Sequence, residues 1–279
     1  MNALRSAQGS GTIVAAMAEE SRQPEISRAI PALVSPGRGV IRTLQGVNFQ
    51  RLTVDAAIAL LDAHVQARRP LKVAIANAHT LNLARTNARY RRLLGDFTLF
   101  NDGIGVELAS RLRYGVGFPA NLNGTDFLPA YLAGSALQLR VFLVGARPPV
   151  VAGAFAEAQR RFPQHLWQGC ADGYAGVKDE AALCAKLRAE PPDLLLVAMG
   201  NPLQEQWIAR CASASGATVC VGVGALFDFL AGEVRRAPRW VRGLHLEWGY
   251  RLVQEPRRLW RRYLLGNASF LWHAWRERK

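Results

Sequence analysis

Short apolar segments alternate with amphipathic segments along most of this chain of 279 residues. The apolar segments have the length of buried β-strands, and the amphipathic ones have the period and length of helices. Alternation of this kind favours a parallel sheet covered by helices. We therefore predict an α/β fold with a Rossmann-like, mostly parallel sheet and covering helices. The expected strands are 40–44, 72–76, 97–100, 139–144, 193–198 and 218–223, and the expected helices are 53–67, 81–94, 104–112, 125–137, 150–162, 179–189 and 204–212.

The same pattern divides the chain into three parts. Residues 1–38 are rich in Ser, Ala, Gly and Pro without sustained periodicity, which indicates a loosely ordered N-terminal extension. Its short apolar stretch is followed at once by two glutamates, unlike a signal peptide. Residues 39–232 form the expected α/β domain. Residues 233–279 are rich in Arg and Trp at helical spacing, which predicts a helical C-terminal appendage.

Much of the positive charge lies in that appendage. The chain has a formal net charge of +14, and half of its residues are hydrophobic. This composition excludes a disordered protein, and no apolar run approaches the roughly 20 residues that span a bilayer. From Glu233 onward there are twelve basic and four acidic residues, hence eight of the fourteen net charges, and five of the seven tryptophans. An anionic partner is expected: nucleic acid, anionic lipid or a phosphorylated substrate.

Two interpretations of the appendage follow from its sequence. Trp260, Trp272 and Trp275 with flanking arginines are typical of a helix at the surface of an anionic membrane. Alternatively, the helix packs on its own domain or on a neighbouring subunit, which leaves a homo-oligomer open. Nucleic acid is disfavoured, because the charge follows an enzyme-like sheet edge and does not cover a reading surface.

Polar and glycine-rich turns follow the expected strands. Ligands of open parallel sheets bind beyond the carboxyl ends of the strands, so these turns are the expected site. Asp102 opens a helix there, where a carboxylate can take a proton from a hydroxyl; a turn or helix cap is the alternative for this residue type. The turns contain Asn77, residues 101–103, Gly145, residues 200–202 and residues 222–224.

Other residues near these turns also have two interpretations each. The turn with Asn123, Gly124 and Asp126 suits a nucleotide or sugar, and helix capping explains it equally well. Gln204 and Glu205 follow Gly200 at the start of a helix, where they contact a ligand or face solvent. His79 either lines the pocket or is an ordinary core or surface histidine.

Several enzyme classes are disfavoured because their motifs are missing. No G-x-G-x-x-G opens the first βαβ unit, and there is no Walker A or H-E-x-x-H sequence. The four cysteines include no close pair, which favours reduced thiols in a cytoplasmic protein over a zinc site. We therefore expect neither a metal nor another cofactor.

The chain from about residue 40 to its end resembles the WecG/TagA/CpsF family of bacterial glycosyltransferases. Individually its motifs are weak, but their order and intervals are specific. They are residues 77–79 (NAH), 101–106 (NDGIGV), 123–126 (NGTD), 142–145 (FLVG), 172–174 (DGY), 199–205 (MGNPLQE), 221–228 (VGVGALFD), 236–238 (RAP), 246–252 (LEWGYRL), 255–258 (EPRR) and 262–263 (RY).

The resemblance implies an inverting transferase that moves a sugar from a UDP-sugar to a sugar on undecaprenyl diphosphate. It implies Asp102 as the general base and adds Asp228 to the substrate-binding residues. Many members have a threonine where this chain has Ile75, which leaves the role of that threonine and the related donor or acceptor preference open. The donor is UDP-N-acetylmannosamine, its uronic acid, or UDP-glucose as in exopolysaccharide assembly. A non-catalytic nucleotide- or nucleic-acid-binding protein is the remote alternative.

The departing diphosphate needs positive charge, and without a metal site arginines and helix N-termini must supply it. Arg251, Arg258 and Arg262 lie in the family-like motifs of the appendage and are the expected ligands; solvated or lipid-facing charges are the alternative. Since an undecaprenyl carrier stays in the membrane, we expect a peripheral enzyme on the inner face of the bacterial plasma membrane.

Overall fold

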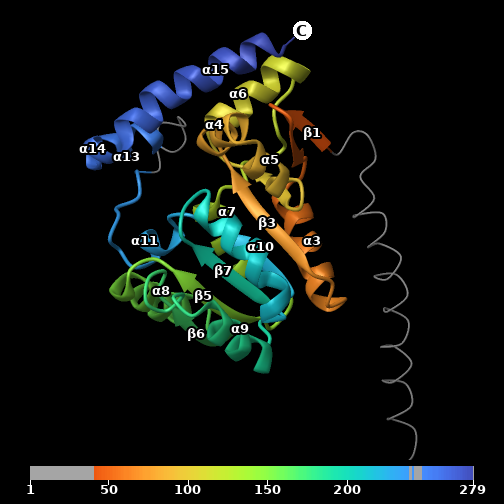
Figure 1. Cartoon of the computed structure of the whole chain (residues 1–279), viewed down its shortest axis with the longest axis vertical. Coiled ribbons are helices and arrows are strands. Elements are labelled where there is room, and N and C mark those ends of the chain that lie inside the picture. The colour runs from red at the N-terminus through yellow and green to blue at the C-terminus, as the bar shows by residue number, and fades with distance from the viewer. Residues whose placement is uncertain (1–40, 239–240, 242–246, 279) are drawn as a thin grey trace, which may run out of the picture. The chain divides into compact units, whose positions relative to one another are not determined.

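A computed structural model describes residues 41–238, 241 and 247–278, apart from the side chain of Arg258. Its eight strands form one sheet in the order β1–β2–β4–β3–β8–β7–β5–β6 (Figure 1). Only the pair β1–β2 is antiparallel, and the other neighbours are parallel. The strands are β1 (Ile41–Leu44), β2 (Val47–Gln50), β3 (Leu71–Ala76), β4 (Thr98–Asn101), β5 (Arg140–Gly145), β6 (Leu166–Ala171), β7 (Leu194–Ala198) and β8 (Val219–Gly222). The predicted α/β fold class is confirmed.

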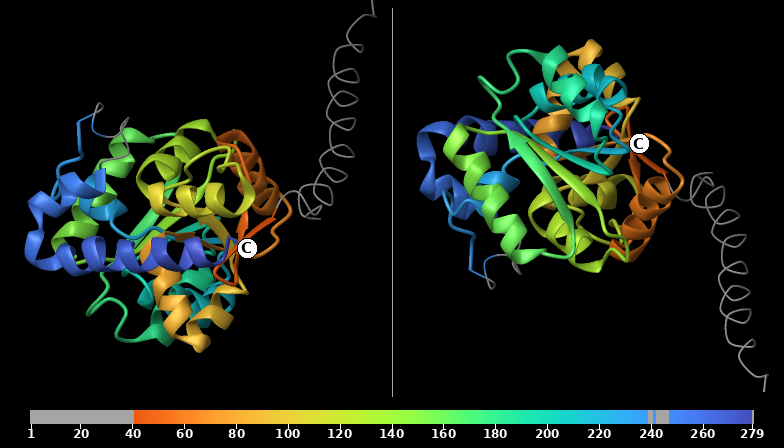
Figure 2. Two further views of the ribbon diagram at one scale, coloured as in Figure 1. Left: turned by 90° about the horizontal axis from the view of Figure 1, so that it is seen from above. Right: turned by 90° about the horizontal axis from the view of Figure 1, so that it is seen from below.

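Helices cover both faces of the sheet (Figure 2). Strand β3 shows why, because its side chains alternate between the two faces: Ala74 and Ala76 join one core, and Val73 and Ile75 are buried on the other side. The first core is covered by α4 (Ala78–Thr86), α5 (Ala88–Leu94), α6 (Gly103–Tyr114), α9 (Glu180–Ala189) and α10 (Leu203–Ser215). The second face has α3 (Val54–Gln66), α7 (Gly124–Gly134), α8 (Pro148–Arg161) and α11 (Leu226–Leu230).

Side-chain caps explain where several helices begin. Thr53 caps α3 through its Oγ1, which accepts a hydrogen bond from Ala56 N, as predicted. The expected helix 81–94 is instead two helices, α4 and α5, capped by Asn77 and Asn87. The prediction missed this break because apolar residues keep their helical spacing across it. What separates the two helices is the side chain of Asn87, which caps α5.

Two strands were not expected from the sequence. Strand β2 follows β1 through a tight turn at Gln45 and Gly46, both with positive φ. Strand β6 lies at the opposite edge, where five of its residues are partly and one largely exposed. Neither segment has the continuous apolar run by which the buried central strands were recognised.

The predicted helical C-terminal appendage is confirmed in its described part. It contains α13 (Glu247–Gln254), α14 (Pro256–Trp260), the π-helix η1 (Arg261–Leu265) and α15 (Gly266–Arg276). Helix α15 packs on α4 and α6, so one of its faces belongs to the α/β fold. Within the described residues, no helix combines the length and apolar character needed to cross a bilayer. The expected extension 1–38 lies outside the described residues.

Candidate active site

A cavity of about 980 Å³ lies at the carboxyl edge of the sheet. Its walls come from the turns after the parallel strands β3 to β8, as expected for an open parallel sheet, and from the C-terminal helices α13, η1 and α15. The cavity therefore combines two regions that the sequence had suggested separately. The predicted site residues that line it are Asn77, His79, Asp102, Asn123, Gly124, Asp126, Gly200, Gln204, Asp228, Arg251 and Arg262.

Asp102 precedes α6, but its side chain makes no capping hydrogen bond to that helix. Its Oδ2 instead accepts a hydrogen bond of 3.0 Å from Asn77 Nδ2. The amide of Asn77 is itself fixed, because its Oδ1 accepts from the backbone N–H groups of His79 and Thr80 at the start of α4. The residue that caps α4 thus holds the Asp102 carboxylate at the cavity, and Asp102 does not cap α6 with its side chain.

The surroundings of Asp102 favour a carboxyl group of raised proton affinity. Desolvation by the surrounding protein raises its pKa above the ordinary value, and the charge of Asp126 adds to this. The hydrogen bond from Asn77 and the charges of Arg262 and Arg251 act in the opposite direction. A base whose pKa is moved toward neutrality takes a proton more effectively at physiological pH.

His79 lines the same cavity in its neutral form. Burial, and to a smaller extent the nearby charge of Arg262, lower its pKa to about 4. The imidazole therefore carries no charge at neutral pH. It can donate or accept a hydrogen bond but offers no fixed cation to an anionic substrate.

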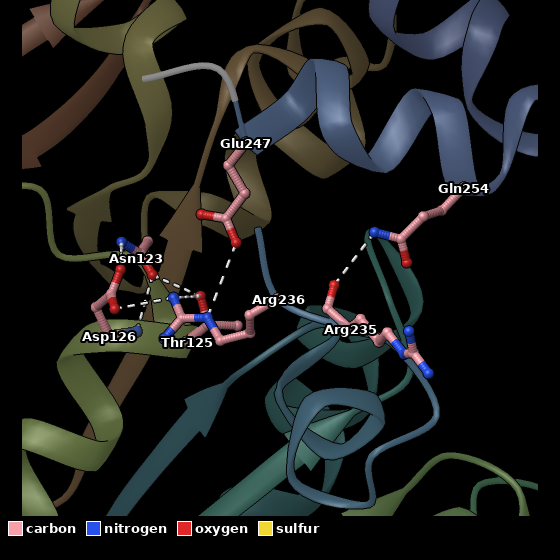
Figure 3. A network of polar contacts seen from close by, with 7 residues as sticks. All are labelled: Asn123, Thr125, Asp126, Arg235, Arg236, Glu247 and Gln254. Atoms are coloured by element: carbon pink, nitrogen blue, oxygen red, sulfur yellow. Dashed lines mark hydrogen bonds and ion pairs between the residues drawn. The ribbon is translucent and has the colours of Figure 1, made fainter. Parts of the chain in front are cut away.

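One network of polar contacts joins the start of α7 to the C-terminal helices (Figure 3). Asn123 caps α7 by accepting from Asp126 N at 2.9 Å, which is the capping alternative that its sequence allowed. Arg236 donates 2.8 Å to Asp126 Oδ1 and 3.2 Å to Thr125 Oγ1. Its Nε also lies 3.9 Å from Glu247 Oε1, on the first residue of α13. Arg236 thereby ties the wall of the cavity that α13 supplies to the wall that α7 supplies.

Gln204 and Glu205 are both buried, so neither faces solvent. Gln204 lines the cavity and accepts a hydrogen bond from Gly224 N, which holds the turn after β8. Glu205 lies behind that wall, where Tyr90 Oη, Asn201 Nδ2 and Gln204 Nε2 all donate to it. Burial raises the pKa of Glu205 despite these donors. Its position fits a support for the turns after β7 and β8.

The remaining predicted residues differ in their placement. Gly145 is not part of the cavity wall, and a side chain at this position would overlap the carbonyl of Ala198, so the glycine serves close strand packing. Arg251 places its guanidinium 5.3 Å from the ring centre of Phe229. The side chain of Arg258 lies outside the described part of the structure.

Sequence reasoning missed several side chains of the cavity wall. Arg147 and Tyr174 follow β5 and β6, and the rule that pointed to the other strand ends would have found Arg147. Trp248 and Tyr263 were assigned to the appendage as a whole, but here they face the cavity and pack edge to face at 6.3 Å. Among the residues that the structure describes, no cluster of His, Cys, Asp or Glu could hold a metal ion.

The fold and the site define an α/β enzyme in which a desolvated carboxylate and arginines from C-terminal helices face one cavity. The sequence model of the glycosyl transferase WecG/TagA/CpsF family matches residues 42–279. The chain belongs to this family, which confirms the predicted resemblance and the enzyme class of glycosyltransferase.

Two relatives are similar to more than half of the chain. Both are called N-acetylglucosaminyldiphosphoundecaprenol N-acetyl-beta-D-mannosaminyltransferase. The protein of Bacillus spizizenii is 39% identical over 184 residues, which cover 65% of this chain and 70% of the relative. That of Bacillus subtilis is 35% identical over 164 residues, which cover 58% of this chain and 62% of the relative. The match thus spans less than two thirds of the second relative.

Proposed function

We propose that this protein is an inverting glycosyltransferase that uses a UDP-sugar donor and a sugar acceptor on undecaprenyl diphosphate. Membership of the family and the names of the two relatives support this class of reaction. The relatives' names favour an N-acetylmannosamine donor and an N-acetylglucosamine acceptor. The observation that carries the proposal is the Asp102 carboxylate at the cavity. Asn77 donates a hydrogen bond to it, and the charges of Arg251 and Arg262 favour its ionised form.

In the proposed reaction Asp102 removes the proton of the acceptor hydroxyl. The oxygen forms a bond to the anomeric carbon of the donor sugar while the bond from that carbon to UDP breaks on the opposite face. The configuration of the sugar is therefore inverted, the proton remains on the carboxyl group and UDP leaves as an anion. One positioned base contributes about two to four orders of magnitude to the rate.

The charge that develops on the departing diphosphate needs stabilisation in a site that excludes water. Arg251 and Arg262 line the cavity from α13 and η1 and are the assigned ligands. Asn123, Gly124, Gly200, Gln204 and Asp228 line the remaining walls and are assigned to binding the sugars and the nucleotide. The predicted role of Arg258 as a third diphosphate ligand remains part of this proposal.

The appendage is proposed to hold the enzyme at the inner face of the plasma membrane, where the lipid-linked acceptor lies. One face of α15 is buried on the α/β fold, and its outer side exposes Trp272 and Trp275, which stack at 5.6 Å. Trp260, Leu264 and Leu265 are exposed on the adjoining turns. Indole rings beside arginines suit the interface of an anionic bilayer. Packing on the domain thus accounts for one face of α15, and the proposed membrane contact uses the opposite face.

One residue of the cavity wall bears on the choice of the donor sugar. Ile75 stands where many family members have threonine, and it lines the cavity next to Gly124. Because the hydroxyl of that threonine is absent here, three donors are to be compared: UDP-N-acetylmannosamine, its uronic acid and UDP-glucose.

A panel of UDP-sugars tests the function with a short-chain diphosphate lipid that carries N-acetylglucosamine. We expect one donor to give a product mass that is larger by one sugar residue, together with release of UDP, and expect Asp102→Asn to bind UDP without turnover. Release of UDP with none of the donors, or near-normal turnover by Asp102→Asn, would overturn the proposal. Binding of nucleotide or nucleic acid without any turnover would favour the non-catalytic alternative.

A further inference from the structure

Helix α15 packs on α4 and α6, the two helices that begin directly after the proposed base and its hydrogen-bond partner. Asn77 caps α4, and Asp102 directly precedes α6. Both helices contact α15, which runs along them in Figure 1 and crosses the molecule in the view from above in Figure 2. A segment near the C-terminus therefore touches both elements that hold the Asn77–Asp102 pair.

Phe270 lies where α15 meets these two helices. Its side chain is fully buried. A Cβ atom added to Gly105 would lie 3.2 Å from the Cβ of Ala78 and 3.6 Å from Cε1 of Phe270. Because Ala78 follows Asn77 and Gly105 lies in the first turn after Asp102, α4 and α6 come close at their beginnings and the phenyl ring packs beside this contact.

Polar contacts fix α15 in this position at several points along its length. Asn82 Nδ2 donates 2.7 Å to Gly266 O at the start of the helix. Gln45 Nε2 donates 3.3 Å to the carbonyl of Phe270 itself, and Gln45 N donates 3.1 Å to Glu277 Oε2. These bonds come from α4 and from the β1–β2 turn, so the ring of Phe270 cannot shift along the helices without breaking them.

We propose that Phe270 is a positioning residue, which keeps the first turns of α4 and α6 at the spacing that lets the Asn77 amide reach the Asp102 carboxylate. This inference rests on the proposed role of Asp102. Charged groups act on that carboxylate from three other elements: Arg262 from η1, Arg251 from α13 and Asp126 from α7. Phe270 is uncharged, so its effect passes through geometry.

Phe270→Ala tests this with the short-chain acceptor and without vesicles, so that membrane binding does not enter. A small misplacement of catalytic groups costs up to about a hundredfold in rate, and we expect a loss in kcat of about ten- to a hundredfold with little change in the KM for the donor. Phe270→Leu should recover most of the rate. Leu112→Ala, an exposed truncation on α6, is the matched control and should keep the wild-type rate.

A double-mutant cycle with Asn77→Ser separates positioning from a general effect on stability. If Phe270 acts through the Asn77–Asp102 pair, Phe270→Ala should lower kcat much less in the Asn77→Ser background than in the wild type. Losses that multiply in the double variant, or a loss confined to UDP binding, would overturn the inference. Should Phe270→Ala not fold, Gly105→Ala carries the same cycle, because its added Cβ atom would press on Ala78 and on the ring of Phe270. Turnover by Asp102→Asn, measured in parallel, would instead show that the proposed function fails.

Discussion

The side chain of Asn77 binds the proposed base and caps a helix at the same time, since its Nδ2 lies 3.0 Å from Asp102 Oδ2 while its Oδ1 accepts from His79 N. The two ends of the amide are distinct, so the capping bonds decide which way the NH₂ group points. Rotation of the amide would break the cap and the bond to Asp102 together. The capping bonds at the start of α4 thus hold the Asn77 NH₂ group in the orientation that donates to the Asp102 carboxylate.

Asn77→Ser separates these two roles. Serine is a good helix cap, so the loss of stability should stay below about 1 kcal/mol, but it lacks the amide donor. The bond from Asn77 lowers the pKa of Asp102, so its loss raises that pKa. A general base must be ionised, and the acidic limb of the kcat/KM profile should therefore move to higher pH. Stopped assays over a pH series measure the shift.

Asn87→Ser is the matched control, because Asn87 caps α5 and lies outside the cavity wall. Its pH profile should coincide with that of the wild type. An unchanged acidic limb in Asn77→Ser would show that Asp102 does not set that limb.

Arg251→Gln and Arg262→Gln should each lower kcat by about a hundredfold, as expected when one stabilising donor is lost from a reacting anion. Lysine at either position should recover part of the rate, because it keeps the charge without the planar donor pair. Arg257→Gln on α14 is the exposed control. Equal rates for all three Gln variants would contradict the assignment of the diphosphate ligands.

Arg262→Gln should also change the titration of His79. Burial is the main cause of its pKa of about 4, and the charge of Arg262 is the second cause. Removing this charge raises the pKa of His79, which NMR titration of the imidazole resonances can follow. An unchanged titration would show that the two side chains do not interact.

The fold was predictable where burial made the pattern unambiguous. Strands β3, β5, β7 and β8 lie inside the sheet between parallel neighbours, so their sequences contain continuous apolar runs. The alternation of these runs with helices indicates the α/β fold class. Strand β6 was not predictable in this way, because an edge strand leaves its side chains partly exposed. The division between α4 and α5 depends on the cap of Asn87, a local hydrogen bond that periodicity does not report.

The site was predictable where topology alone brings residues together. Asn77 and Asp102 follow neighbouring strands β3 and β4, whose carboxyl ends must meet. By contrast, the burial of Glu205 depends on Tyr90, which is 115 positions away in the chain. The link between Arg236 and Asp126 likewise depends on how the C-terminal segment packs. Such contacts between distant segments leave no periodic signal in the sequence.

Glu205→Gln tests the buried network by its pH dependence. The folded protein raises the pKa of Glu205 above its ordinary value of 4.5, so folding favours the protonated form. The free energy of unfolding therefore falls as the pH rises from about 4.5 through the raised folded-state pKa. Glutamine stays neutral, and the variant should lack this part of the fall. Urea denaturation at several pH values measures it, and parallel curves for both proteins would contradict the prediction.

The exposed tryptophan pair gives a prediction for the membrane. Replacing both Trp272 and Trp275 by alanine removes the stacked indoles from the outer side of α15 while Phe270 stays buried on the other side. We expect weaker sedimentation with vesicles of anionic lipid, because the rings no longer enter the interface. Binding of the wild type should also fall with added salt, since each surface Lys or Arg contributes about 1 kcal/mol through its charge. Leu166→Ala at the β6 edge, an equally exposed apolar truncation, should bind as the wild type does. If the double variant sediments unchanged but elutes as a smaller species in gel filtration, the pair is a contact between subunits and the membrane assignment of α15 is wrong.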